Sequence, residues 1–115
     1  MLDLDGMLSI VMPAYNEEKL IYDSIMETLR IVEKFVPELE IVAVNDGSKD
    51  NTKAEIQRAM REDKRVRIVS SEKNRGKGNA IIAGVSQVEG KYVAFVDADL
   101  ELNPSQLEGY LKKMI

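Results

Sequence analysis

Two carboxylates, Asp97 and Asp99, directly follow the apolar run Tyr92 to Val96 and are the side chains of this sequence best placed to hold a cation. Residues two apart on an extended chain share a face and lie roughly 6.5 to 7 Å apart, and a turn at Ala98 would bring them closer. Carboxylate oxygens, completed by phosphate oxygens of a ligand, are donors that Mg²⁺ and Mn²⁺ favour. The spacing alone leaves two interpretations open, a cation site or a polar turn that only ends the strand.

Two further segments carry side chains suited to a nucleotide. Asp46 follows the apolar run Ile41 to Val44 and could accept the ring N–H of uracil or guanine, although an Asp here also forms turns by bonding to its own backbone. The segment Asn74 to Gly78 places Gly76 and Lys77 at the expected start of a helix, where backbone N–H groups and basic side chains favour an anion. An exposed basic turn is the other interpretation, and the segment does not fit a Walker loop.

Tyr15 and Glu17 follow the first apolar run, Leu8 to Ala14. The ring of Tyr15 could stack on a base or close the hydrophobic core. Glu17 is also explained by the preference of acidic residues for a first helical turn, where the helix dipole favours negative charge.

Composition excludes several classes of chemistry. The 115 residues contain no Cys and no His, which excludes disulfides, zinc-thiolate sites, cysteine nucleophiles and histidine bases. Sixteen Lys and Arg against 20 Asp and Glu give a net charge of -4, which argues against a nucleic acid as the main partner. No apolar run is long enough to span a bilayer and the acidic N-terminus is unlike a signal peptide, so we expect a cytoplasmic setting.

Apolar runs alternate with helical patterns along the whole chain, which has the length of one domain, residues 1–115. Strands are predicted at 8–14, 40–45, 66–69 and 92–96, and helices at 20–36, 52–63, 78–88 and from 104 onward. The expected helix signals are Asn16 as first N-cap, Pro37 as first stop, a Thr52–Glu55 capping box, and Asn103, Pro104 and Gln106 at the last helix. Continuously apolar strands indicate a parallel sheet covered on both faces, a Rossmann-like α/β fold.

The carboxyl ends of all four predicted strands lead into polar residues. Ligands of open α/β sheets bind outside those ends. The groups around Tyr15, Asp46, Lys77 and Asp97 should therefore gather along one rim, whatever each motif indicates alone.

Four segments occur in the order found in family-2 glycosyltransferases of GT-A fold: Pro13-Ala14-Tyr15-Asn16-Glu17, Asn45 to Thr52, Asn74 to Ala80, and Asp97-Ala98-Asp99-Leu100. The sequence resembles dolichol-phosphate mannose synthases and related polyprenyl-phosphate glycosyltransferases from about Leu8 onward. The resemblance implies the nucleotide-sugar-binding, N-terminal half of a GT-A fold.

The resemblance also assigns residues. It implies a nucleotide site of Pro13, Tyr15, Glu17, Asp46, Gly76, Lys77 and Asp97, and a Mg²⁺ or Mn²⁺ site of Asp97, Asp99 and Glu101. Two positions depart from the family pattern: Glu101 stands where a Gln is usual, and Asn45 replaces the first Asp of a frequent Asp-Asp pair.

The activity implied is inverting transfer from a GDP- or UDP-sugar, with a polyprenyl or dolichyl phosphate as one acceptor. The family places its acceptor site and catalytic residues well beyond the Asp-x-Asp motif, whereas this sequence runs only to Ile115. We therefore expect the catalytic residues to lie beyond Ile115, in a longer protein of which this chain is a truncated part. The chain itself should recognise a nucleotide and have little activity alone.

Two other classes of function stay open. A non-catalytic module would self-associate into a homo-oligomer through an exposed edge at Tyr92 to Val96. A phosphoacceptor receiver would need an acidic pair after the first strand, where the chain has Asn16 and glutamates instead.

Overall fold

The computed structural model describes residues 1–115 and alternates strands with helices as predicted. The strands are β1 (Leu8–Ala14), β2 (Leu39–Asp46), β3 (Val66–Ser71) and β4 (Tyr92–Phe95). The helices are α1 (Ile21–Val32), α2 (Thr52–Glu62), α3 (Lys77–Val85), the 3₁₀ helix η1 (Pro104–Gln106) and α4 (Leu107–Met114). No helix combines the length and apolar character needed to cross a membrane.

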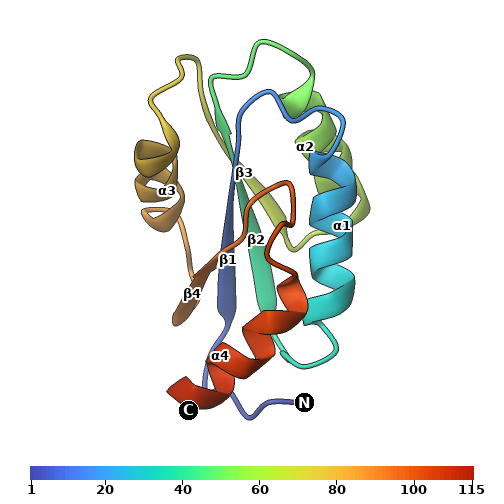
Figure 1. Ribbon diagram of the computed structural model, residues 1–115, viewed down its shortest axis with the longest axis vertical. Coiled ribbons are helices and arrows are strands. Elements are labelled where there is room, and N and C mark those ends of the chain that lie inside the picture. Colours follow the sequence, from blue (N-terminus) through green and yellow to red (C-terminus); the bar gives the residue numbers. More distant parts are fainter.

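The four strands form one parallel sheet in the order β3-β2-β1-β4. Helices α1 and α2 cover one face and α3 covers the other, which confirms the Rossmann-like three-layer arrangement (Figure 1). The chain moves outward from β1 to β3 and then returns to add β4 on the other side of β1. The crevice at the carboxyl ends of β1 and β4 is therefore the topological switch point, the usual ligand site of such sheets.

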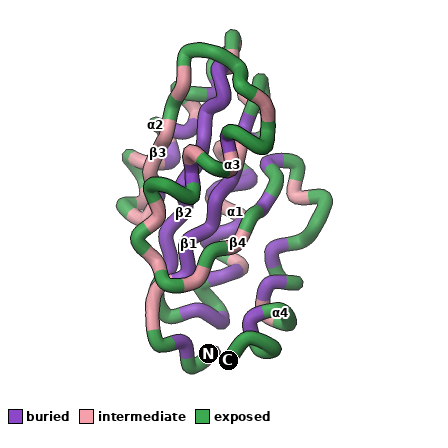
Figure 2. The backbone as a smooth tube through the Cα atoms, turned by 90° about the vertical axis from the view of Figure 1, so that its left-hand side faces the viewer, coloured by how far each residue is buried: buried purple, intermediate pink, exposed green.

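The central strands are buried along nearly their whole length, whereas the edge strands are not (Figure 2). On the α1 face, a large core gathers side chains that include Ile10, Met12, Ile25, Ile41 and Ile56. On the α3 face, a small core holds Val11, Val44 and Ala80. The continuous apolar pattern thus predicted two-sided burial correctly for β1 and β2, but β3 and β4 each have one unpaired edge.

The predicted N-cap of the first helix was wrong. Asn16 does not cap it, because α1 begins at Ile21 and Asn16 has a left-handed backbone, φ 52°. The Asn16 side chain instead accepts the backbone N–H of Lys49 at 2.9 Å, a bond to the β2–α2 loop. The helix also ends early, at Val32 rather than near Pro37.

The second helix has the predicted extent but not the predicted capping box. The carboxylate of Asp50 accepts both the backbone N–H of Thr52, at 2.9 Å, and its hydroxyl. Glu55 forms an ion pair with Arg58 at 2.8 Å instead of reaching back to the cap. The carboxylate of Asp50, two positions before Thr52, therefore takes the role expected of the Glu55 side chain.

The last two helical segments agree more closely with the prediction. Helix α3 stops at Val85, three residues before the predicted end. Asn103 caps the last helical segment as predicted, by accepting the backbone N–H of Ser105 at 2.9 Å. Gln106 takes part through its backbone N–H, bonded to the carbonyl of Asn103 at 2.9 Å, rather than through its side chain. Helix α4 then continues to Met114, and the backbone N–H of Ile115 donates to the carbonyl of Leu111 at 3.2 Å.

Candidate functional site

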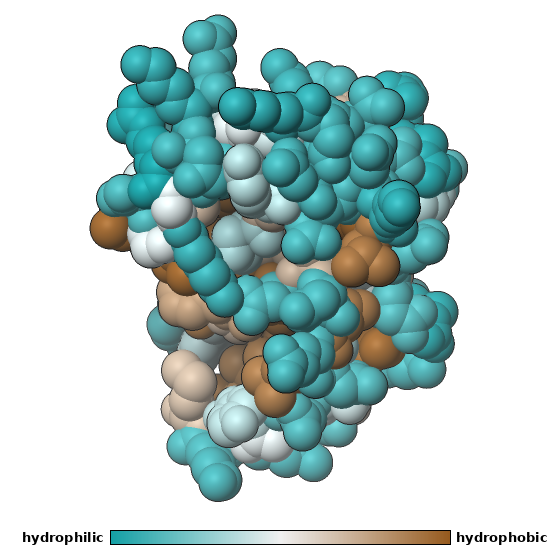
Figure 3. Space-filling model, turned by 45° about the horizontal axis from the view of Figure 1, so that its top comes forward, coloured by the Kyte–Doolittle hydropathy of each residue, from teal (hydrophilic) through white to brown (hydrophobic).

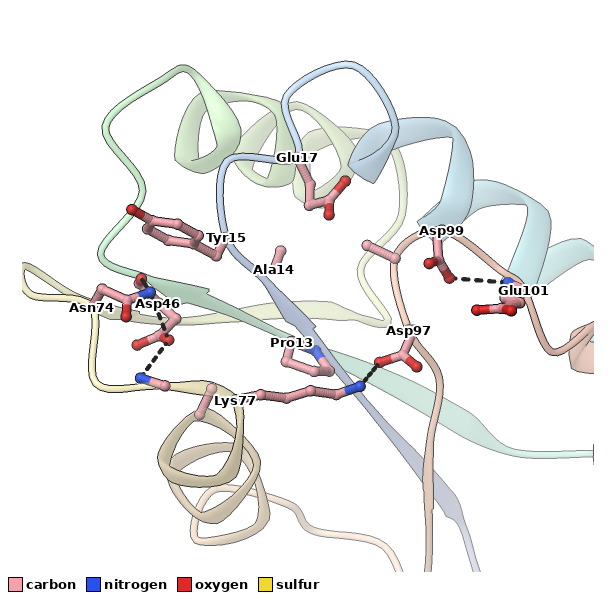
Figure 4. Close-up of a pocket in the computed structure, with 13 residues that line it drawn as sticks. Pro13, Ala14, Tyr15, Glu17, Asp46, Asn74, Lys77, Asp97, Asp99 and Glu101 are labelled. Atoms are coloured by element: carbon pink, nitrogen blue, oxygen red, sulfur yellow. Dashed lines mark hydrogen bonds and ion pairs between the residues drawn. The ribbon is translucent and has the colours of Figure 1, made fainter.

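A pocket of about 530 Å³ lies at the carboxyl ends of the strands, where the surface is mostly hydrophilic with some hydrophobic residues between the hydrophilic ones (Figure 3). Its thirteen lining residues are Pro13, Ala14, Tyr15, Glu17, Asp46, Asn74, Gly76, Lys77, Ala80, Asp97, Ala98, Asp99 and Glu101. All nine predicted site residues are among them, and they come from the carboxyl ends of the strands and from the segments that follow all four strands (Figure 4). The convergence expected from topology is therefore present.

The loop after β1 is fastened to the loop after β2. The backbone N–H of Asn16 donates to Ser48 Oγ at 2.9 Å, and that of Glu17 donates to Thr52 Oγ1 at 2.8 Å. These bonds fix the backbone at Asn16 and Glu17. Tyr15 is 43% exposed at the mouth of the pocket, so its ring does not close the core.

Asp46 anchors the start of α3. Its buried carboxylate accepts the backbone N–H of Arg75 on Oδ1 at 2.9 Å, and that of Gly76 on Oδ2 at 3.0 Å. The side-chain amide of Asn74 also donates to Oδ2, at 3.2 Å. A carboxylate has about four acceptor positions. These three bonds occupy one position on Oδ1 and two on Oδ2, so about one remains, on Oδ1.

The structure contradicts the turn-forming interpretation of Asp46, whereas its contact with a base stays a prediction. The carboxylate bonds to the loop after β3 rather than to its own turn. The amide of Gly76, expected to face an anion, donates to Asp46. Asn74 belongs to the third family motif, but no role was predicted for it. No pattern in the neighbouring sequence indicates its pairing with Asp46.

The Asp97-Ala98-Asp99 segment forms a tight turn, as its spacing allowed. The backbone N–H of Leu100 donates to the carbonyl of Asp97 at 3.0 Å, and Leu100 has a left-handed φ of 51°. Asp99 Oδ1 accepts the backbone N–H of Glu101 at 3.0 Å. Ala98 is buried, whereas Asp97 and Asp99 on either side of it are exposed, so the two carboxylates stand on the solvent side of the turn.

Helix α1 also holds this turn, through a residue that sequence reasoning missed. The hydroxyl of Ser24 donates to the carbonyl oxygen of Ala98, and both residues are buried. The two are 74 positions apart. The available signal was a polar side chain on the buried face of an amphipathic helix.

Lys77 crosses the pocket to Asp97. Its Nζ lies 2.6 Å from Asp97 Oδ1. The hydrogen bond to Asp97 raises the pKa of Lys77 above its ordinary value, and the negative charge of Asp99 adds to this effect. Both partners are more than half exposed, so the pair contributes little to stability, but it keeps a positive charge beside the two carboxylates.

The three predicted metal ligands line one pocket but do not converge. No group of three or more carboxylates is close enough to hold a metal ion by itself. Asp97 faces Lys77, whereas Asp99 bonds to the amide of Glu101 (Figure 4). Mg²⁺ and similar ions are commonly held by one or two carboxylates together with phosphates and waters. The donor set therefore fits a metal that a diphosphate completes.

The C-terminal end of the chain contributes nothing to this pocket. The last residue that lines it is Glu101, and α4 carries the chain away to Ile115, at the end of the molecule opposite the rim (Figure 1). The structure therefore does not test the expectation that the catalytic residues lie beyond Ile115, and that expectation stays a prediction.

Residues 9–115 match the glycosyl transferase family 2 domain. This chain belongs to that family. It is 36% identical over 111 residues to a dolichyl-phosphate beta-glucosyltransferase of Trichomonas vaginalis, covering 92% of this chain and 33% of the relative. It is 34% identical over 101 residues to an undecaprenyl-phosphate 4-deoxy-4-formamido-L-arabinose transferase of Proteus mirabilis, covering 87% of this chain and 31% of the relative. The chain thus spans about a third of these relatives.

Solved structures support the same fold. A mannosyltransferase from Pyrobaculum calidifontis, in complex with GDP-Man and Mn²⁺, has a TM-score of 0.78 at 25% identity, over 91% of this chain and 31% of that one. The TarS 1-349 structure from S. aureus, in complex with UDP-GlcNAc, has a TM-score of 0.75 at 29% identity, over 91% and 30%. The predicted family and GT-A fold are confirmed.

Proposed function

We propose that the pocket binds the nucleoside diphosphate of a GDP- or UDP-sugar together with Mn²⁺ or Mg²⁺, for inverting sugar transfer. The observation that carries this proposal is the convergence of all nine candidate residues on one pocket at the switch point of the sheet. The volume of about 530 Å³ lies within the range of small-molecule sites. Two structural neighbours were solved with a nucleotide sugar, one of them also with Mn²⁺.

Each wall of the pocket offers one part of this recognition. The exposed ring of Tyr15 offers an aromatic face to the base, and Asp46 offers its remaining acceptor position to a ring N–H. Lys77 brings positive charge to the diphosphate, beside the metal-binding carboxylates Asp97 and Asp99. This juxtaposition of opposite charges supports the binding of a diphosphate together with a metal.

The sugar acceptor that we propose is a lipid phosphate, because the names of two relatives carry dolichyl and undecaprenyl phosphate. In such a transfer, negative charge builds up on the departing diphosphate. A bound divalent metal would stabilise that charge. Lys77 would add to this stabilisation by donating hydrogen bonds from its ammonium group.

The residues that complete this transfer belong, in our proposal, to the part of the protein beyond Ile115. In this proposal the lining residues of the pocket hold the donor nucleotide and its metal, and none of them binds the acceptor. We expect this chain alone to bind the nucleotide sugar without transferring the sugar to a lipid phosphate. Transfer by the chain ending at Ile115, measured with a radiolabelled nucleotide sugar and polyprenyl phosphate, would contradict this division.

Amide shifts in a nuclear magnetic resonance titration test where the ligand binds. We expect UDP or GDP, added with diamagnetic Mg²⁺, to shift the amides of Tyr15, Asp46, Lys77 and Asp99. The amides at the C-terminal end of α2, the end of that helix away from the rim, serve as an internal control and should not move. Absence of shifts along the rim at millimolar ligand would refute the proposal.

A second candidate, self-association through the edge of β4, is favoured by a separate observation. β4 pairs only with β1, and its side chains Val93 and Phe95 are 38% and 50% exposed. Unpaired apolar edges invite pairing with another chain. We expect light scattering at high concentration to show a dimer or larger species that Val93→Lys disperses, and a monomer throughout would exclude this candidate.

A further inference from the structure

The turn that carries Asp97 and Asp99 is held from three directions. The backbone N–H of Val96 donates to the carbonyl of Val11 at 3.0 Å, which fixes the end of β4 to β1. The ammonium of Lys77 reaches Asp97 from α3. From the opposite face of the sheet, the Ser24 hydroxyl of α1 donates to the Ala98 carbonyl. This third bond, unlike the pair with Lys77, is buried.

We propose that Ser24 is a positioning residue, which sets the orientation of Asp99 toward a metal-bound diphosphate. This inference rests on the proposed function of the pocket. Ser24 does not line the pocket and would not touch a ligand there. It acts through the backbone of the turn.

The planarity of the peptide bond transmits the effect. The Ala98 carbonyl and the Asp99 nitrogen lie in one rigid plane. Fixing the direction of that carbonyl therefore fixes the plane from which the Asp99 side chain leaves. The carbonyl is buried and needs a donor, so loss of the Ser24 hydroxyl would favour rotation of the plane toward another donor or toward water.

Thr28 provides an internal comparison, because it lies one turn further along α1. It is also buried, but its hydroxyl has no hydrogen-bond partner. The buried face of α1 thus carries two hydroxyls at equivalent helical positions. That of Ser24 is bonded to the turn, and that of Thr28 is not.

The test compares Ser24→Ala with Thr28→Val in the chain as it stands. The measured quantity is the affinity for UDP and GDP with and without Mn²⁺, by calorimetry. We expect Ser24→Ala to weaken the metal-dependent affinity about tenfold, the lower end of what residues supporting metal ligands contribute. The affinity without metal should be unchanged, and Thr28→Val should match the parent chain in both. Equal metal dependence in Ser24→Ala and the parent chain would overturn the inference.

Two further measurements separate loss of the hydrogen bond from loss of packing, and failure of this inference from failure of the proposed function. Ser24→Cys keeps the buried volume with a weaker donor and should fall between parent and Ser24→Ala, whereas a loss due to packing alone would leave it at the parent value. If the parent chain binds no nucleotide, the proposed function fails. The amide shifts of Asp99 and Glu101 in free Ser24→Ala then still decide the positioning role, because unchanged shifts would refute it.

Discussion

Replacing Gly47 with alanine is expected to destabilise the fold by about 4 kcal/mol, the sum of backbone strain and steric overlap. Gly47 has a φ of +67°, which disfavours any residue with a Cβ atom. An added Cβ would also overlap backbone atoms of Lys73 and Asn74, which cannot move aside as a flexible side chain would. Urea unfolding of the two proteins measures the difference. The effect should be large because the backbone that the added Cβ would displace, at Lys73 and Asn74, leads directly into the amides that Asp46 binds before α3.

Two other glycines near the pocket separate the effect of backbone strain from that of steric overlap. Gly76 has a φ of +95° with nothing near its missing Cβ, so Gly76→Ala isolates the strain. Gly78 has open space and lies in the first turn of α3, so Gly78→Ala should be neutral or stabilising by up to about 1 kcal/mol. Equal unfolding midpoints for Gly47→Ala and Gly78→Ala would show that the contact between the two loops is absent.

Glu40→Gln is expected to cost about 3 kcal/mol, at the opposite end of the sheet from the pocket. The Glu40 side chain in β2 is only 7% exposed. Its carboxylate accepts the Ser9 hydroxyl at 2.6 Å and the Glu89 backbone N–H at 2.8 Å, and it pairs with Arg67 at 2.8 Å. A glutamine would turn an N–H₂ group toward at least one of these donors. Chemical denaturation at neutral pH measures the loss.

The same carboxylate should make stability depend on pH. Burial alone would raise the pKa of Glu40, but hydrogen bonds from the Glu89 backbone N–H and the Ser9 and Arg67 side chains lower it below its ordinary value of 4.5. A lowered pKa in the folded state stabilises the protein above pH 4.5, and this contribution is lost as the pH falls through the folded-state pKa. The parent chain should therefore lose more stability than Glu40→Gln between about pH 5 and pH 3.

A matched control is Glu27→Gln, which removes an exposed carboxylate paired with Arg30 on α1. Exposed pairs of this kind contribute roughly 0 to 1 kcal/mol, so its stability should stay close to that of the parent chain. If Glu40→Gln and Glu27→Gln lose the same stability, and lose it equally with falling pH, the buried network does not stabilise the fold.

The elements and the location of the pocket were predictable because they depend on local pattern and general topology. Apolar runs marked β1 and β2, and the rule that ligands bind at carboxyl ends of parallel strands gathered Tyr15, Asp46 and Asp97 before any contact was known. Helix starts were less predictable where long-range bonds compete with local ones. Asn16 has the residue type of an N-cap, but its side chain bonds to Lys49 in another loop.

The supports of the site were not predictable from local sequence at all. The bonds from Asn74 to Asp46 and from Ser24 to Ala98 join residues 28 and 74 positions apart. Each depends on how two loops or a helix and a turn meet after the sheet has formed. Nine of the thirteen pocket residues were predicted from strand ends and family motifs, whereas the side chains that hold them in place appear only in three dimensions.

The central claim is that this rim binds a nucleoside diphosphate together with a metal. Its most direct test is the calorimetric affinity for UDP and GDP, with and without Mn²⁺, in the parent chain and in Asp99→Asn. We predict that Mn²⁺ strengthens nucleotide binding in the parent chain and that Asp99→Asn loses at least about tenfold of the metal-dependent affinity, or roughly 1.4 kcal/mol. Binding that ignores Mn²⁺, or that Asp99→Asn leaves intact, would contradict the claim.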